Sequence, residues 1–545
     1  LISRQKAKDV NDAQVKRNEI INAAAAFHNN DTSDSDNYNK MHFSIPDTQE
    51  QYADGSGGSP TYTVYNIYIN GNYHCCLRYK QLHALHEQLR RRCTDAALPP
   101  FPPKRLLPLS NSQLETRRAA LEHYLQIIGQ DARIARLSYL QQFLQRAQLE
   151  TALAECTVSR EDEQQQLQVE VYSGSAAGSE GGGVQLLVNC HVQQNASALL
   201  QCVCRMLQLP VELMQYFCLY LMRKVGSGDG PSSSPDDPPA VLLLRRLMDF
   251  ESPFITRLHA QPCQLLLRTC YWNARWDAKL LSNSVALNLL YHQTLADVAR
   301  EWVICTPEMR RQLCSLQMQA RPLQYLELVR QLPSYGCLQF GAAQVDYPEV
   351  DTTALVTIGN RELSLRTARG TKIYETKFRV TRMRCWRVSA MHNTYESRDQ
   401  PTQLQLSFEY LMSKQTLRWI TITSQQAMLM SVSLQAMVDE LLHIDSSISG
   451  GSDDEHEAST SRGASESTIS TPSSVSSSSC TSTSGISTTT ATATTTPPVK
   501  FLAQRCKQQH KLTTARTFAA VFFRNDENAA SVRNEAFEGI GDDDL

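Results

Sequence analysis

The sequence lacks a long apolar run, a regular cysteine spacing and an excess of charge of either sign. It has no stretch of about 18 apolar residues, so no segment is predicted to span a bilayer. Its 16 cysteines show no paired spacing typical of a zinc site or a secreted disulfide framework, which favours reduced thiols in a cytosolic protein. The formal net charge of −2 gives no global attraction to nucleic acid, so any anion binding must be local.

Motifs of catalysis are missing as well. We find no phosphate-binding loop, no G-x-S-x-G nucleophile elbow and no paired acid/base constellation, so we expect neither an enzyme nor a bound metal or cofactor. The 545 residues predict two to four domains, and a hydrophobic fraction of 41% is enough to build their cores.

Basic groups and an aromatic ring come from three separate segments near the start of the chain. Arg78 and Tyr79 end a predicted strand (72–79) that leads into a helix, Lys104 follows a proline-rich segment, and Arg117 lies on the next helix. The planar fork of arginine matches phosphate oxygens, lysine supplies a point charge, and a tyrosine ring can cover one face of a flat polar ring. If the segments fold together, they predict a site for a small phosphorylated ligand.

The proline-rich segment 98–103 is predicted to be extended, because proline fixes φ and keeps the preceding residue out of the α region. A short apolar tip, Leu106 and Leu107, follows it beside basic residues. Such a tip suits insertion into a bilayer interface.

These motifs together resemble the PX domain, the phosphoinositide-binding module of sorting nexins. The resemblance implies that Arg78 holds the 3-phosphate and Lys104 the 1-phosphate of phosphatidylinositol 3-phosphate. It further implies that Tyr79 packs on the inositol ring and that Arg117 binds the ring hydroxyls. Arg118 is adjacent but does not match the motif position. The alternative is a set of solvated charges on ordinary helices.

The rest of the chain changes its hydrophobic period several times. Alternating strands around one helix (163–271) follow the order of a ubiquitin-like roll, and a helical stretch (272–348) comes next. Strands followed by one amphipathic helix (349–443) follow the order of a PTB/PH-like lobe. Together they resemble a FERM module, and with a PX domain at 41–150 they resemble the PX–FERM sorting nexins. The predicted fold is therefore multidomain α+β, with a disordered extension at 1–40.

The resemblance implies a peptide groove in the third lobe. PTB-like lobes add an extended peptide as a strand to an exposed sheet edge beside the terminal helix. The residues that match the groove of the family are Trp386 on a strand and Val438 and Leu442 on the helix. We interpret Trp386 as a half-exposed anchor between two arginines, and a plain core residue is the alternative. No basic pocket for phosphotyrosine stands out, so an unphosphorylated Asn-Pro-x-Tyr or Asn-x-x-Tyr motif should suffice.

The tail divides into two parts. Residues 444–533 are rich in Ser and Thr and are predicted to be a disordered linker. Residues 534–545 are acidic but also carry apolar side chains, which a merely solubilising end does not explain. The resemblance implies a linear motif that engages the Retriever recycling complex, part of Commander. Its predicted contact residues are Phe537, Ile540, Asp543 and Leu545.

The expected function is that of a monomeric endosomal cargo adaptor on the cytosolic face of early endosomes. Such an adaptor binds phosphatidylinositol 3-phosphate membranes and receptor tails, and it returns receptors to the cell surface instead of to lysosomes. No nucleic acid is expected as a partner. A membrane-docked effector of small GTPases, or a cytoskeletal linker, remains the alternative, because ubiquitin-like FERM lobes can bind such partners.

Overall fold

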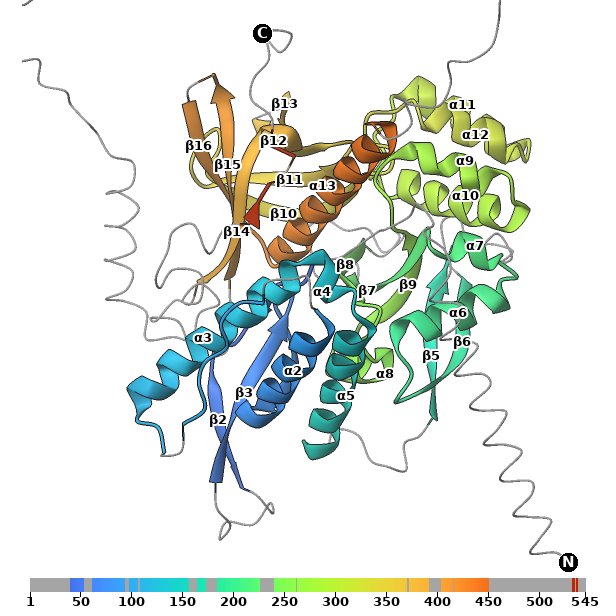
Figure 1. Cartoon of the computed structure of the whole chain (residues 1–545). Coiled ribbons are helices and arrows are strands. Elements are labelled where there is room, and N and C mark those ends of the chain that lie inside the picture. The colour runs from blue at the N-terminus through green and yellow to red at the C-terminus, as the bar shows by residue number, and fades with distance from the viewer. Residues whose placement is uncertain are drawn as a thin grey trace, which may run out of the picture. The chain divides into compact units, whose positions relative to one another are not determined.

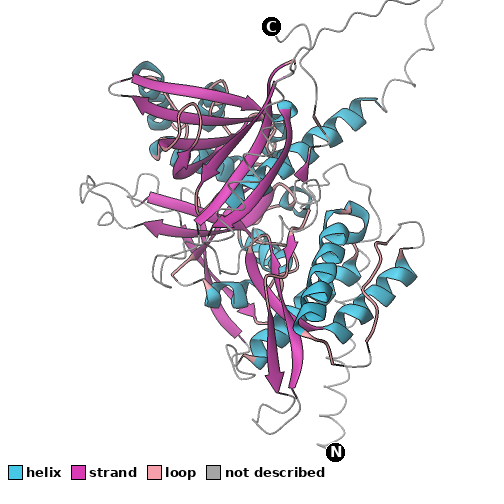
Figure 2. Cartoon of the chain, turned by 90° about the vertical axis from the view of Figure 1, so that its left-hand side faces the viewer, coloured by secondary structure: helices cyan, strands magenta, loops and turns pink. Residues whose placement is uncertain are grey.

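The structure is a computed structural model that describes thirteen stretches of the chain. They are residues 40–52, 61–93, 98–105, 108–155, 164–172, 184–225, 240–260, 262–369, 372–391, 403–414, 416–449, 532–534 and 536–537. Most of the predicted extension at 1–40 and of the predicted linker at 444–533, namely residues 1–39 and 450–531, lies outside the described residues. Figure 2 shows the described strands and helices by type.

The first unit, residues 40–155, packs helices against a four-stranded antiparallel sheet in which β3 pairs with each of the other strands. Asn70 and Gly71 form the tight turn between β3 and β4, and both have positive φ angles, 48° and 74°. Its elements are β1 (Phe43–Ser44), β2 (Thr48–Tyr52), β3 (Thr61–Ile69), β4 (Asn72–Arg78), α2 (Tyr79–Arg92), α3 (Asn111–Gln130), α4 (Ala132–Ala135) and α5 (Ser138–Ala154).

A five-stranded sheet forms the next lobe, in the order β6-β5-β9-β7-β8. Strands β5 and β9 are parallel and the other pairs are antiparallel, as in a ubiquitin-like roll. Asn195 caps α6 by accepting a hydrogen bond from the amide of Ala198. The elements are β5 (Gln164–Val171), β6 (Val184–His191), α6 (Ala196–Met206), α7 (Val211–Met214), β7 (Phe217–Val225), β8 (Ala240–Arg246), α8 (Pro253–His259) and β9 (Gln264–Thr269).

The helical lobe follows directly and shares one buried core with the five-stranded sheet. Thr306 caps α11, with Pro307 in the first turn, as the sequence indicates. Its elements are η1 (Ala274–Trp276), α9 (Asp277–Leu281), α10 (Ser284–Ala299), α11 (Pro307–Met318) and α12 (Pro322–Val329).

The third lobe contains an eight-stranded antiparallel sheet in the order β13-β12-β11-β10-β16-β15-β14-β17, with helix α13 beside it (Figure 1). Its elements are β10 (Leu338–Val345), β11 (Thr352–Gly359), β12 (Glu362–Arg369), β13 (Lys372–Arg379), η2 (Val380–Arg382), β14 (Met383–Met391), β15 (Gln403–Ser413), β16 (Thr416–Thr423), α13 (Ala427–Ser449) and β17 (Val532–Arg533).

Three predicted boundaries of this lobe differ from the structure. Strand β10 pairs with β11 and β16, so the helical lobe ends before it and not at 348. Helix α13 continues to Ser449, past the predicted end at 443. Residues 532–533, predicted to lie in the disordered linker, form strand β17. These boundaries depend on pairing between distant segments, which local composition does not encode.

Helix α13 connects the lobes through its side chains. Trp386 donates its indole N–H to Ser431 Oγ at 3.1 Å, inside the third lobe. Glu440 accepts from the main-chain N–H groups of Trp272 (2.7 Å) and Asn273 (2.9 Å), and from the Trp276 indole N–H (3.1 Å), all at the start of the helical lobe. One carboxylate therefore satisfies three donors of a neighbouring lobe.

The first unit also packs directly on the five-stranded lobe. Met248 and Phe250 belong to the buried core of the first unit, and the Phe250 ring lies edge-on to His74 at 5.6 Å. The His74 imidazole is 7% exposed and donates from Nε2 to the carbonyl oxygen of Leu144 at 3.0 Å. Burial lowers the pKa of His74 to about 4, although the bond to Leu144 opposes the shift.

This packing predicts a pH-dependent stability. His74 is neutral in the fold but titrates near 6.5 when unfolded, so the unfolded state binds more protons between pH 6.5 and pH 4. The stabilisation is present above pH 6.5 and is lost as the pH falls toward 4. We expect the free energy of unfolding to fall by about 1.3 kcal/mol through this histidine between about pH 7.5 and 5.5. Urea unfolding at both pH values should show a smaller fall in His74→Gln than in the parent. His123→Gln, at an exposed position of α3, is the matched control, and an equal fall in all three proteins would contradict the prediction.

Candidate functional site

The structure brings the predicted phosphate-binding residues of the first unit together at one end of α2 and α3. Arg78 directly precedes α2, and its guanidinium lies over the ring of Tyr62 on β3. Tyr79 is the first residue of α2, and the Arg117 guanidinium lies 4.4 Å from the centre of its ring. Two arginines and an aromatic ring thus share one surface, as the motifs predict. Tyr62 was not identified from the sequence, because nothing local shows which ring on β3 will face Arg78.

The proline-rich segment is held onto this surface by specific contacts. The Tyr79 hydroxyl donates to the carbonyl oxygen of Pro102 at 2.7 Å, and Arg117 Nη2 donates to that of Pro103 at 3.4 Å. Phe101 stacks on His86 with ring centres 4.8 Å apart and meets Tyr124 edge-on. These contacts fix the segment relative to both helices, and Lys104 follows directly after the residue that Arg117 contacts.

Two further basic residues near this surface, Lys104 and Arg118, differ in exposure. Lys104 is exposed, whereas Leu106 and Leu107 lie outside the described residues. Arg118, excluded by the motif, is 5% exposed and forms ion pairs with Glu115 (2.9 Å) and Glu122 (2.8 Å). Its charge is used inside the fold and is not offered to a ligand.

In the third lobe, the edge of the sheet at β14 carries a strand from the tail of the same chain. Strand β17, drawn in red beside β14 in Figure 1, runs antiparallel to it. Val532 lies opposite Trp386 and Arg533 opposite Cys385. This is the strand addition that PTB-like lobes use for peptides.

Asn534 anchors the tail at the end of this pairing. It is 6% exposed, and its Nδ2 donates to the carbonyl oxygens of Val380 and Met383, both at 2.7 Å. Its main-chain N–H donates to the Arg384 carbonyl oxygen at 3.2 Å. Only an amide side chain offers two donors in this position while its oxygen accepts from the Ala536 amide at 3.0 Å.

The tail segment thus closes a tight turn from Asn534 to Phe537, whose amide donates to the Asn534 carbonyl oxygen at 3.2 Å. Its sequence, Asn-Glu-Ala-Phe, is similar to the Asn-x-x-Tyr motif expected in receptor tails, with Phe in the place of Tyr. That match was the signal that could have located this segment, but the tail motif was interpreted only as a binding site for another complex.

The predicted role of Trp386 as a half-exposed anchor is wrong. Its side chain is fully buried, because it occupies an inward position in the alternation of β14. Its contribution to the edge is its backbone, which pairs with Val532. Its side chain is therefore that of a core residue, which was the alternative interpretation from the sequence.

The two predicted helix residues lie on one face of α13. Val438 is buried in the core of the third lobe, and Leu442 is half-buried against the same core, as are Val532 and Ala536 of the tail. Phe537 is half-buried and is the last described residue, while Ile540, Asp543 and Leu545 lie outside the described residues.

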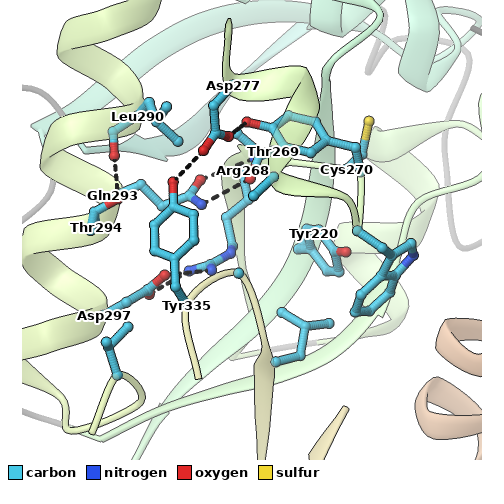
Figure 3. A pocket seen from close by; sticks show the side chains of 16 residues that line it. Tyr220, Arg268, Thr269, Cys270, Asp277, Leu290, Gln293, Thr294, Asp297 and Tyr335 are labelled. Atoms are coloured by element: carbon cyan, nitrogen blue, oxygen red, sulfur yellow. Dashed lines mark hydrogen bonds and ion pairs between the residues drawn. The ribbon is translucent and has the colours of Figure 1, made fainter. Parts of the chain in front are cut away.

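A separate small pocket lies between β9, α10 and the start of β10 (Figure 3). Its volume is about 40 Å³, and its polar groups bond to one another. Arg268 and Asp297 form a bidentate pair at 2.8 Å, and Asp277 accepts from the hydroxyls of Tyr271 and Tyr335. We interpret it as a structural junction with no room for a ligand larger than water.

Among the helices that the structure describes, none combines the length and the apolar character that a membrane-spanning helix needs.

Comparison with known families agrees with this arrangement of a PX unit and three FERM lobes. The PX domain family matches residues 65–147, and the sorting nexin 17/27/31 FERM domain, F1 lobe, matches residues 181–272. The sorting nexin 17/31 FERM domain, F2 lobe, matches residues 273–333, and the Sorting Nexin 17 FERM C-terminal domain matches residues 336–442.

Curated relatives extend over most of the chain. Human sorting nexin-17 is 42% identical over 412 residues, which cover 74% of this chain and 82% of the relative. Human sorting nexin-31 is 30% identical over 413 residues, covering 74% of this chain and 86% of the relative. Among solved structures, the FERM and C-terminal domain complex of Drosophila Merlin aligns with 52% of this chain and 98% of that chain, at 13% identity and a TM-score of 0.31. The chain belongs to the sorting nexins, in the PX–FERM group that includes sorting nexins 17 and 31.

The geometry of Asn534 leads to a direct prediction. Asn534→Asp keeps the size of the side chain but replaces its two N–H donors with a carboxylate oxygen facing the carbonyls of Val380 and Met383. We expect the tail to leave the edge, because two hydrogen bonds of about 1 kcal/mol each are lost and repulsion is added. Hydrogen exchange should then accelerate by about tenfold or more at the amides of residues 384–388. Unchanged exchange there, with β12 as the internal reference, would show that Asn534 does not hold the tail.

Proposed function

We propose that this chain is an endosomal cargo adaptor. In this proposal the PX domain docks on phosphatidylinositol 3-phosphate at the cytosolic face of early endosomes. The third FERM lobe binds Asn-Pro-x-Tyr or Asn-x-x-Tyr tails of receptors, which are thereby recycled and protected from lysosomal degradation. The single observation that carries the proposal is the Asn-x-x-Phe segment of the chain's own tail, seated on β14 with its asparagine bonded to Val380 and Met383.

The lipid half of the proposal is supported by the clustering of Arg78, Tyr79, Lys104 and Arg117. The Tyr79 hydroxyl bonds to Pro102, so its ring is held in a fixed orientation beside the Arg117 guanidinium. A flat inositol ring with phosphates on its edge suits such a surface, because each arginine can make charge-assisted bonds while the tyrosine covers a ring face. Leu106 and Leu107 would add an apolar contact with the bilayer in this proposal.

The cargo-binding half of the proposal is supported by the hydrogen-bonding groups at the sheet edge formed by β14. Backbone pairing along β14 is independent of peptide sequence, so selectivity has to come from the asparagine and from the side chains that lie against α13. Val438 and Leu442 supply the apolar part of that selection. Since the tail occupies the edge that a receptor would need, receptor and tail compete in this proposal.

The acidic end of the tail has a second role in the proposal. Ile540, Asp543 and Leu545 engage the Retriever complex of Commander, together with Phe537. Because Phe537 belongs to the segment seated at β14, a receptor that displaces the segment would also free this contact.

Lipid binding is tested with vesicles that contain or lack phosphatidylinositol 3-phosphate. Arg78→Gln or Arg117→Gln should each weaken co-sedimentation by about tenfold or more, since a hydrogen bond to a charged group is worth about 1.5–3 kcal/mol. Arg146→Gln, at an exposed position of α5, removes the same charge elsewhere and should bind as the parent does. Equal binding to vesicles without the lipid would reject a head-group site.

Cargo binding is tested by calorimetric titration of the full chain with an unphosphorylated Asn-Pro-x-Tyr peptide. The double variant Asn534→Asp/Phe537→Ala should bind about tenfold more tightly than the parent, because the competing tail is released. Adding Leu442→Asp should abolish binding, since a charge then faces the apolar part of the groove.

The matched control for that titration is Leu323→Asp, which changes a 47% exposed leucine of the helical lobe and should leave binding intact. Absence of peptide binding in both the parent and the tail variant would reject the adaptor and favour the GTPase-effector alternative.

A further inference from the structure

Arg78 differs from the other arginines near the predicted lipid site in the kind of neighbour that holds it. Arg118 forms ion pairs with two glutamates, and Arg117 donates to the carbonyl oxygen of Pro103. Arg78 has no carboxylate partner among the described residues, and its side chain is exposed. Its guanidinium carbon instead lies 2.9 Å from the centre of the Tyr62 ring. An aromatic ring, and not an acid, therefore restrains this arginine.

The register of the sheet explains why these two side chains meet. Arg78, at the end of β4, lies directly opposite Val64 on β3, and Tyr62 lies two residues before Val64 on the same strand. Because the side chains of a strand alternate between faces, Tyr62, Val64 and Arg78 project from the same face of the sheet. Diagonal neighbours of this kind are within reach of long and aromatic side chains. The contact therefore follows from strand pairing.

Tyr62 is itself held in place by the neighbouring strand. Its ring is half-buried, and its hydroxyl donates at 3.1 Å to Oε1 of Gln51, which lies directly opposite on β2. The Gln51 amide also reaches the Cys76 sulfur of β4, with 3.7 Å between Nε2 and Sγ. The backbone of Arg78 is fixed as well, since its N–H donates to Gln81 Oε1 at 2.8 Å. The ring and the arginine are thus both anchored in the fold.

The geometry of stacking suits an arginine that binds phosphate. A guanidinium carries all its N–H donors in one plane, and they match two phosphate oxygens along an edge of that plane. A ring that covers a face of the plane leaves those donors free, whereas a carboxylate would bind the same donors and neutralise the charge. An exposed arginine also loses less rotamer freedom on binding if its orientation is already fixed. Tyr62 can therefore restrain Arg78 without competing with the phosphate.

We infer that Tyr62 is a positioning residue of the lipid site, which holds the Arg78 guanidinium flat so that its edge meets the phosphate of the head group. Tyr62 does not contact the lipid and acts only through Arg78. The inference rests on the proposed function, and it adds to the lipid site a residue of β3 that lies outside the motifs from which the site was predicted.

The test measures co-sedimentation of the full chain with vesicles that contain phosphatidylinositol 3-phosphate. Tyr62→Leu should bind about threefold to fivefold more weakly than the parent, because a stacked cation at an exposed site contributes that factor. Tyr62→Phe keeps the ring and loses only the bond to Gln51, so its binding should stay within about twofold of the parent. In an Arg78→Gln background, measured at a higher lipid content, adding Tyr62→Leu should cause no further loss, since the group that the ring positions is gone.

Tyr139→Leu is the matched control. Tyr139 is also half-buried in the first unit, and the guanidinium of Arg92, at the other end of α2 from Tyr79, lies 4.2 Å from its ring centre. The variant removes the same kind of stacked pair away from the lipid site and should bind as the parent does. A general weakening of the fold is thereby separated from an effect on the site.

Each other outcome decides against the inference. Equal binding of Tyr62→Leu and the parent would overturn it and leave the lipid site standing, whereas tighter binding would mean that the ring withholds Arg78 from the lipid. A further loss in the Arg78→Gln background would show that Tyr62 acts on the fold and not through the arginine. If the parent binds no better than to vesicles without the lipid, the proposed lipid site is rejected and the inference with it.

Discussion

The architecture depends on helix α13, because this one element completes interactions that three other parts of the chain leave unfinished. Its Ser431 satisfies the buried indole of Trp386, and its Glu440 accepts three N–H groups at the start of the helical lobe. Asp439, beside it, lies 3.2 Å from Lys40 of the first unit. A buried donor without a partner costs about 1–3 kcal/mol, so the helix cannot shift without leaving several such groups unsatisfied.

The same helix carries the two residues predicted for the peptide groove. Val438 and Leu442 pack on the core of the third lobe, against which Val532 and Ala536 of the tail also pack, while Asp439 and Glu440 bind other parts of the chain. One helix therefore positions both the predicted groove residues and the contacts between lobes. The PX surface is likewise fixed to the FERM module, since Met248 and Phe250 complete its core. The predicted lipid-binding residues and the sheet edge at β14 thus belong to one connected body of packed side chains.

Sequence patterns predicted that Arg78, Tyr79 and Arg117 come together, because these residues belong to short motifs whose spacing sets their geometry. Arg78 and Tyr79 are neighbours in sequence, and Arg117 faces Tyr79 once α2 and α3 pack. The order of strands and helices also predicted all three FERM lobes. Patterns failed where pairing is long-range. Strand β10 directly follows the helical lobe in sequence but pairs with β16. Trp386 is buried, as the alternation of its strand requires, although it lies between two arginines in sequence. The seat of Asn534 depends on contacts across about 150 residues.

Strand β17 belongs to the same chain as the sheet edge that it covers, although about 80 residues separate it from the end of α13. Their pairing is intramolecular, so it does not weaken when the protein is diluted. A peptide from another molecule can take the edge only at a concentration that competes with a covalently attached strand. The edge of β14 is therefore closed at any concentration of the protein itself, and only the concentration of the competing peptide can open it.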